Sequence, residues 1–172
     1  MKNREKSWQR DPFYWGSLTL VLLLMGLIFY FSSQTGVQSG GSSGRLDALL
    51  LRWLYPDFSA YSAQRQEDLY FRVDFIVRKT AHVLEFAALG FALRLHLQAV
   101  GRWITIRHPQ FLAWGISTHY AASDELHQFF SAGRAARLAD VGIDSLGVIL
   151  GLLFFLLCAC FYRHNNATKI CK

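Results

Sequence analysis

Apolar runs separated by polar stretches dominate the chain and predict helices that cross a membrane. The first run extends from Phe13 to Phe31 without a charge, and Tyr14, Trp15 and Tyr30 lie near its ends. A helix needs about 20 apolar residues to cross the hydrocarbon core of a bilayer, and aromatic residues concentrate at both interfaces. We interpret this run as a first membrane-spanning helix, since it is longer than the apolar part of a typical signal peptide.

Three further segments are predicted to span the membrane, at residues 80–100, 111–130 and 141–162. The first of these contains His82, Glu85, Arg94 and His96, so hydropathy alone marks it weakly. In the last one, Gly147 and Gly151 form a small-xxx-small pair that lets a neighbouring helix approach closely. The expected fold class is therefore all-α, a polytopic four-helix membrane bundle that forms one domain over residues 1–172.

Residues 32–79 are predicted to form an extracellular loop that contains two helices of its own. The stretch 39–44 is rich in Gly and Ser, a composition typical of a flexible linker. Over 45–55 the apolar residues recur on one helical face, which predicts an amphipathic helix along the membrane surface or across the end of the bundle. A second helix is expected over 63–79 and should continue into the second span.

Composition and charge support a membrane protein and give its orientation. The chain is 52% hydrophobic and only 17% charged, whereas a soluble domain has about 25% charged residues. The formal net charge is +6, and basic residues cluster in the N-terminal segment, the second short loop and the C-terminal tail. By the positive-inside rule these three regions are cytoplasmic, so we expect both termini inside. The bilayer accounts for the basic charge, and nucleic acid is not an expected partner.

Polar residues from all four predicted spans fall at the outer end of the bundle. Ionisable groups at membrane depth are costly and mark function by default. Their agreement on one location is the strongest functional signal in the sequence. The candidate catalytic residues are His82, Glu85, Asp124, Glu125, His127, Asp140 and Asp144. The candidate ligand-binding residues are Ser33, Gln34, Lys79, Gln128, Arg134 and Arg137.

Several kinds of chemistry fit this outer cluster, and the residues alone leave them open. A divalent metal is one alternative, with His82, Glu85, Asp124 and His127 as its ligands. A second is a carboxylate and histidine acid–base centre, in which Lys79 and Arg134 hold a phosphate. A third is a binding pocket for a phosphate-bearing headgroup without chemistry. A buried network that only fixes helix packing is the structural alternative, and transport ranks last because the inner halves of the predicted spans lack a polar path.

Four blocks of this sequence resemble the VanZ-like family of small bacterial membrane proteins. The blocks are Phe31-Ser32-Ser33-Gln34, Arg78-Lys79-Thr80-Ala81-His82-Val83-Leu84-Glu85-Phe86, Ser123-Asp124-Glu125-Leu126-His127-Gln128 with Gly133-Arg134, and Asp140-Val141-Gly142-Ile143-Asp144-Ser145-Leu146-Gly147. Their order and spacing make the resemblance specific. It implies a multi-pass protein of the bacterial cytoplasmic membrane, associated in some members with reduced susceptibility to teicoplanin-type glycopeptides.

The resemblance also suggests a partner for the outer cluster. Teicoplanin-type drugs act outside the membrane on lipid-linked cell-wall precursor, which is the side expected for the cluster. We therefore expect a site that binds or modifies an anionic cell-envelope lipid or precursor and lowers glycopeptide susceptibility. A hydrolase or transferase acting on a lipid-linked phosphate is the enzymatic alternative. The resemblance implies no settled reaction.

Overall fold

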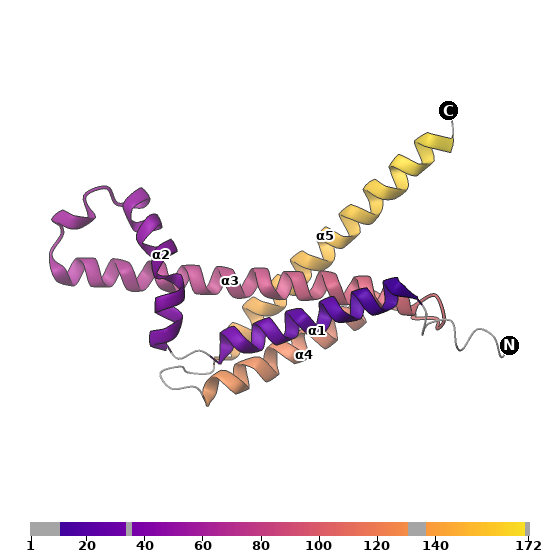
Figure 1. The fold of residues 1–172 in the computed structure, drawn as a ribbon, viewed down its shortest axis with the longest axis horizontal. Coiled ribbons are helices and arrows are strands. Elements are labelled where there is room, and N and C mark those ends of the chain that lie inside the picture. Colours follow the sequence, from indigo (N-terminus) through magenta and orange to yellow (C-terminus); the bar gives the residue numbers. More distant parts are fainter. Residues whose placement is uncertain (1–10, 34–35, 131–136, 171–172) are drawn as a thin grey trace.

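The computed structural model describes residues 11–33, 36–130 and 137–170, and these residues form helices and no strands (Figure 1). The expected all-helical class is thereby confirmed. The helices are α1 (Pro12–Ser32), α2 (Gly36–Leu54), a short 3-10 turn η2 (Phe58–Ala60), α3 (Ala63–Val100), α4 (Pro109–Phe129) and α5 (Leu138–Ile170). As expected, the helix that begins at Ala63 continues without a break through the second predicted span.

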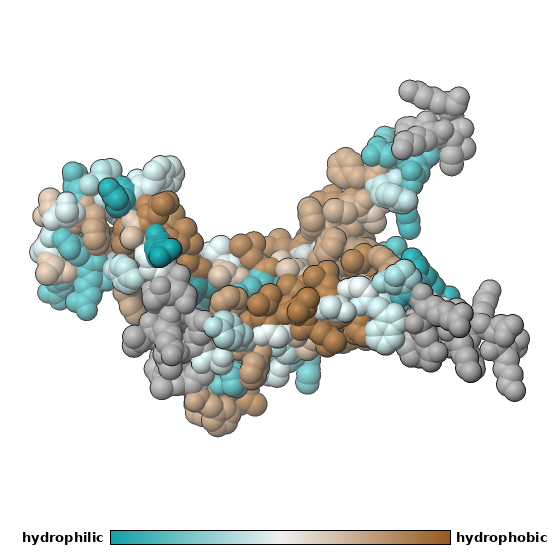
Figure 2. All heavy atoms as spheres, viewed as in Figure 1, coloured by the Kyte–Doolittle hydropathy of each residue, from teal (hydrophilic) through white to brown (hydrophobic). Residues whose placement is uncertain are grey.

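Three of the described helices are long and apolar enough to cross a membrane, namely α1, α3 and α5. The fourth predicted span, α4, is as long as α1 at 21 residues but lacks their apolar composition, because polar side chains occupy its last two turns. Figure 2 shows continuous apolar surface along α1 and α5. Leucine and phenylalanine side chains of these two helices, such as Leu22, Leu153 and Phe154, are exposed, as expected of helices that contact lipid.

Helix α3 is the centre of the assembly and packs against α1, α2, α4 and α5. Its closest neighbour is α5, which crosses it where glycines remove the side chains. A Cβ on Gly147 would lie 2.5 Å from the carbonyl oxygen of Val83, and one on Gly151 would overlap the carbonyl of Ala87. This confirms the close approach predicted from the small-xxx-small pair. Beyond the crossing, α5 diverges from α3 (Figure 1).

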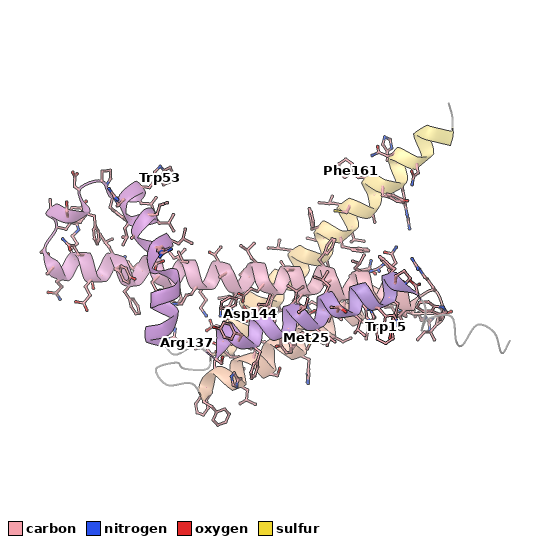
Figure 3. All side chains as sticks on the ribbon, viewed as in Figure 1. Trp15, Met25, Trp53, Arg137, Asp144 and Phe161 are labelled. Atoms are coloured by element: carbon pink, nitrogen blue, oxygen red, sulfur yellow. The ribbon has the colours of Figure 1, made fainter. Side chains whose placement is uncertain are left out.

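The predicted linker over 39–44 is wrong, because these residues belong to α2. The helix crosses the N-terminal half of α3 at a steep angle (Figure 1). Leu51 and Asp47 are buried in the structure, with 2% and 0% of their surfaces exposed, while Leu49 and Trp53 of the predicted apolar stripe stay exposed. The stripe therefore points away from the helices, as Trp53 in Figure 3 illustrates.

Candidate functional site

The candidate site lies where α1 and α4 end and α5 begins, beside the middle of α3. We call this region, marked by Ser32, Lys79, Asp124 and Asp140, the polar end. It forms because α1, α3 and α4 are apolar along most of their packed faces and place their polar residues at the same level. The start of α1 and the end of α3 lie at the opposite end of the bundle (Figure 1).

Asp124 is the most completely buried carboxylate of the polar end, with 3% of its surface exposed. Its Oδ2 accepts a hydrogen bond of 2.6 Å from the Ser32 hydroxyl and one of 2.9 Å from the Gln128 amide. The Gln128 amide also lies 3.2 Å from the Ser32 hydroxyl. The C-terminus of α1 is thus joined to α4 through one carboxylate oxygen. The other oxygen, Oδ1, is buried and has no hydrogen-bond partner among the described residues.

Helix α5 begins beside α3 and adds two aspartates to the polar end. Lys79 pairs with Asp140 at 2.5 Å. One turn further along α5, Asp144 is buried with 4% exposed (Figure 3) and is close enough for electrostatic interaction with Asp124, Asp140 and Lys79. Asp140, Asp144 and Gly147 share one face of α5, so the close glycine contact with α3 brings both carboxylates to the site.

Glu125 is buried beside this group and faces the start of α5. Its Oε1 accepts a hydrogen bond of 2.6 Å from the backbone N–H of Arg137. The Arg137 side chain itself is exposed (Figure 3). Arg137 therefore holds Glu125 through its backbone, and its guanidinium is not part of the buried group.

Two histidines lie on opposite sides of the polar end. His127 stacks on Phe29 of α1, with ring centroids 4.4 Å apart and an interplanar angle of 25°. Its Nε2 is buried and makes no hydrogen bond to any described residue. His82 Nδ1 lies 3.8 Å from Glu85 Oε2 on α3, which is too long for a hydrogen bond.

The predicted ligand residue Ser33 and its neighbour Ser32 have different surroundings in the structure. Ser33 is exposed, and its hydroxyl donates to the Tyr30 carbonyl of its own helix. Ser32 instead is fully buried and binds Asp124. The sequence signal that finds it is the spacing of the buried residues Ser17, Val21, Ile28 and Ser32, which share one face of α1. The predicted ligand residues Gln34 and Arg134 lie outside the described residues.

Sequence reasoning also missed another hydrogen bond between α1 and α4. The hydroxyl of Tyr120 donates a hydrogen bond of 2.7 Å to the backbone carbonyl of Met25 (Figure 3). Tyr120 lies one turn before Asp124 on the same face of α4. Together the two contacts fix the rotation of α4 and turn Asp124 toward α1.

The metal alternative does not fit the described side chains. Within the described part of the chain, no three His, Cys, Asp or Glu side chains are placed to hold one ion. His82 and Glu85 lie on α3, while Asp124 and His127 face α1. The four predicted ligands therefore do not converge on one ion position in the described part of the chain.

The charges of the polar end are unbalanced among the described residues. The polar end holds five carboxylates, those of Glu85, Asp124, Glu125, Asp140 and Asp144. Glu125 and Asp144 are close enough to interact with Lys79, which already pairs with Asp140, and Glu85 is close enough to interact with Asp124. Such a site favours hydrogen-bond donors over further anions, because carboxylate oxygens only accept when ionised.

Comparison with known proteins agrees with the resemblance found in the four sequence blocks. No curated protein and no solved structure is similar enough to this chain to count as a match. The family model described as VanZ/LLP1 matches residues 17–159, which include every described residue of the polar end. Since this match covers well over half of the sequence, the chain belongs to the VanZ/LLP1 family.

Proposed function

We propose that the polar end binds the headgroup of a phosphate-bearing lipid or lipid-linked precursor of the cell envelope, and that binding lowers susceptibility to teicoplanin-type glycopeptides. Asp124 and His127 contact hydroxyl or amide groups of the headgroup. Lys79 and Arg134 hold its phosphate. The carboxylate surplus among the described residues argues for a headgroup rich in donors, such as a lipid-linked sugar, over a bare phosphate.

The observation that carries this proposal is the pair of unsatisfied polar atoms at the junction of α1 and α4. Asp124 Oδ1 can accept a hydrogen bond and His127 Nε2 can donate or accept one, and neither has a partner among the described residues. A buried polar atom without a partner costs about 1–3 kcal/mol. A network that only fixed helix packing would satisfy these atoms. Their unused hydrogen-bonding capacity therefore supports a ligand.

The proposal includes a topology. In it, α1, α3, α4 and α5 all cross the bacterial cytoplasmic membrane, both termini are cytoplasmic and the polar end faces outward. The three apolar helices support this, as does the packing of α4 against both α3 and α5. The exposed stripe of Leu46, Leu49 and Trp53 then lies at the outer interface of the cytoplasmic membrane, where a tryptophan is favoured.

Two linked experiments test the function. The first measures teicoplanin susceptibility in a sensitive Gram-positive host that carries the protein, Asp124→Asn or Arg134→Ala at equal membrane levels. The second measures binding of lipid-linked precursor to the same purified proteins. Ser123→Ala is the matched control, because the exposed Ser123 hydroxyl bonds only within its own helix. We expect both site variants to lose protection and binding and the control to keep them.

Either of two results would overturn the proposal. If Asp124→Asn and Arg134→Ala protect as well as the intact protein, the polar end is a packing network. If the intact protein neither protects nor binds precursor, the family's association with glycopeptides does not extend to this chain.

An acid–base hydrolase or transferase is the second candidate, because His82 and Glu85 are adjacent on α3. Their 3.8 Å separation requires a small side-chain movement before a proton could pass between them. Release of the sugar or phosphate product from bound precursor, and its loss in His82→Ala, would favour this candidate over simple binding.

A further inference from the structure

Arg94 is a charged residue inside the apolar half of α3, far from the polar end. It lies about 9 Å along the helix axis from the last residue, Val100. The side chain is half-buried, and its Cζ lies over the ring of Phe155 on α5, 4.5 Å from the ring centroid. A charge at this depth is costly unless it finds a partner.

The guanidinium lacks a hydrogen-bond partner within the described part of the chain. Nε and Nη1, which carry most of its N–H donors, are buried and bond to nothing described. No described carboxylate lies within 4.0 Å of it. The contact with Phe155 stabilises the face of the guanidinium but leaves these N–H groups unsatisfied.

Its neighbours at this end of α3 are paired, which makes the contrast informative. His96 Nδ1 lies 3.0 Å from the Ser17 hydroxyl of α1. Arg102 donates to Asp11 at 2.7 Å. The described chain thus provides partners for His96 and Arg102 but none for Arg94, which leaves Arg94 for a group that is not part of the described chain.

The surface beside Arg94 belongs to the diverging half of α5. After the glycine crossing, α5 runs away from α3 (Figure 1), and Phe154, Leu157 and Phe161 are exposed (Figure 3 for Phe161). In a bilayer this apolar face contacts acyl chains. The headgroups of the same leaflet then lie near the end of α3, within reach of an arginine about one and a half turns inside it.

We propose that Arg94 binds the phosphate group of a phospholipid whose acyl chains pack against the diverging half of α5. The planar guanidinium matches the geometry of phosphate oxygens and binds them with paired hydrogen bonds. This site lies toward the C-terminal end of α3 and shares no residue with the polar end. It uses the membrane topology proposed above, but it stands or falls independently of headgroup binding at the polar end.

The test is thermal unfolding of the purified protein in micelles with three probes. Phosphatidylglycerol offers both phosphate and chains, a diglucosyl diacylglycerol with the same chains lacks the phosphate, and inorganic phosphate lacks the chains. We expect phosphatidylglycerol alone to raise the Tm, by about 5 °C at saturating concentration. Arg94→Gln should lose this rise and Arg94→Lys should keep part of it. Arg163→Gln is the control, because Arg163 is exposed on the α5 tail.

Native mass spectrometry supplies a second readout that does not depend on a variant's stability. The intact protein should retain phosphatidylglycerol in preference to the glycolipid. An equal rise in Tm for Arg94→Gln and the intact protein would overturn the proposal, and so would equal effects of the two lipids. A rise with inorganic phosphate alone would show an ion site in place of a lipid site. If Arg94→Gln does not fold, equal retention of the two lipids by the intact protein would still refute it.

Discussion

Helix α3 makes two contrasting contacts, one with α5 and one with α2. Against α5, glycines bring backbone onto backbone, and a Cβ on Gly90 would already lie 2.9 Å from the Val148 carbonyl. Against α2, the buried residues are Leu51 and Asp47, and neither carboxylate oxygen of Asp47 has a partner among the described residues. The first contact has no spare space, whereas the second includes an unsatisfied charge.

The difference between these two contacts shows which of them holds the polar end together. Burying Leu51 stabilises the α2 contact by about 1.5–3 kcal/mol. Leaving a buried polar group unsatisfied costs about 1–3 kcal/mol, and more for a charge. These terms nearly offset each other, so α2 is weakly docked on α3. The α3–α5 crossing, by contrast, fixes Asp140 and Asp144 at the polar end.

Gly151→Ala should have the largest effect because it breaks the closer contact. The new methyl group would overlap the backbone carbonyl of Ala87, which cannot rotate away as a side chain can. We expect a loss of about 3 kcal/mol, since overpacking typically costs about 1–3 kcal/mol. The measurement is unfolding in mixed micelles followed by circular dichroism. Gly26→Ala is the control, because no heavy atom lies within 4 Å of its added Cβ. Equal stabilities of the two variants would contradict the described crossing.

Leu51→Ala should release α2 without unfolding the rest of the molecule. Leu51 has 2% of its surface exposed, whereas Leu49 on the same helix is largely exposed. Truncating a buried leucine costs about 2–5 kcal/mol, and we expect the lower end because α3 is the main packing partner of α2. Hydrogen–deuterium exchange should accelerate in residues 45–54 alone. Leu49→Ala should leave the exchange unchanged; acceleration in both variants would mean that α2 is held by its outer face.

The sequence predicted the helices and the polar end for a physical reason. Uncharged runs as long as a bilayer is thick admit few other structures. Consecutive helices of a membrane bundle were expected to reverse direction, which places Ser32, Lys79, Asp124 and Asp140 at one end. The spacing of Gly147 and Gly151 predicted a close helix contact, because close packing requires small residues at every fourth position.

Details that depend on rotation or context were not predictable. A shift of one residue turns a side chain about 100° around a helix, which separates the buried Ser32 from the exposed Ser33. The Gly- and Ser-rich stretch before Arg45 has a weak helix propensity, yet a few tenths to 1 kcal/mol per residue is easily overridden by neighbouring structure. The apolar stripe of α2 predicted an amphipathic helix but not which face α3 would cover.

Asp47→Asn should strengthen the weaker contact, by an amount smaller than the two losses above. It removes a buried charge at nearly constant volume, so we expect a gain of about 1 kcal/mol in α2 docking. The same exchange experiment should show slower exchange over residues 45–54. Asp68→Asn, a change at an exposed acid of α3, should have no effect. Faster exchange in Asp47→Asn would show that Asp47 has a favourable partner and that α2 is firmly docked.

Acid should weaken a third contact, the one between Arg102, just after the end of α3, and Asp11 at the start of α1. Burial alone would raise the pKa of Asp11, but hydrogen bonds from the Phe13 and Tyr14 N–H groups and from Arg102 outweigh it and hold the pKa below the usual 3.8. A carboxylate with a lowered pKa stabilises the fold above its ordinary pKa, and that contribution is lost as the pH falls through the lowered value. We therefore expect amide exchange at the first turn of α1, corrected for its intrinsic pH dependence, to gain protection in the intact protein as the pH rises from below the lowered pKa of Asp11 to above the ordinary 3.8. Asp11→Asn should lack this gain, since an amide does not titrate. The same gain in both proteins would assign the pH dependence to another group and would leave the α1–α3 contact without an electrostatic part.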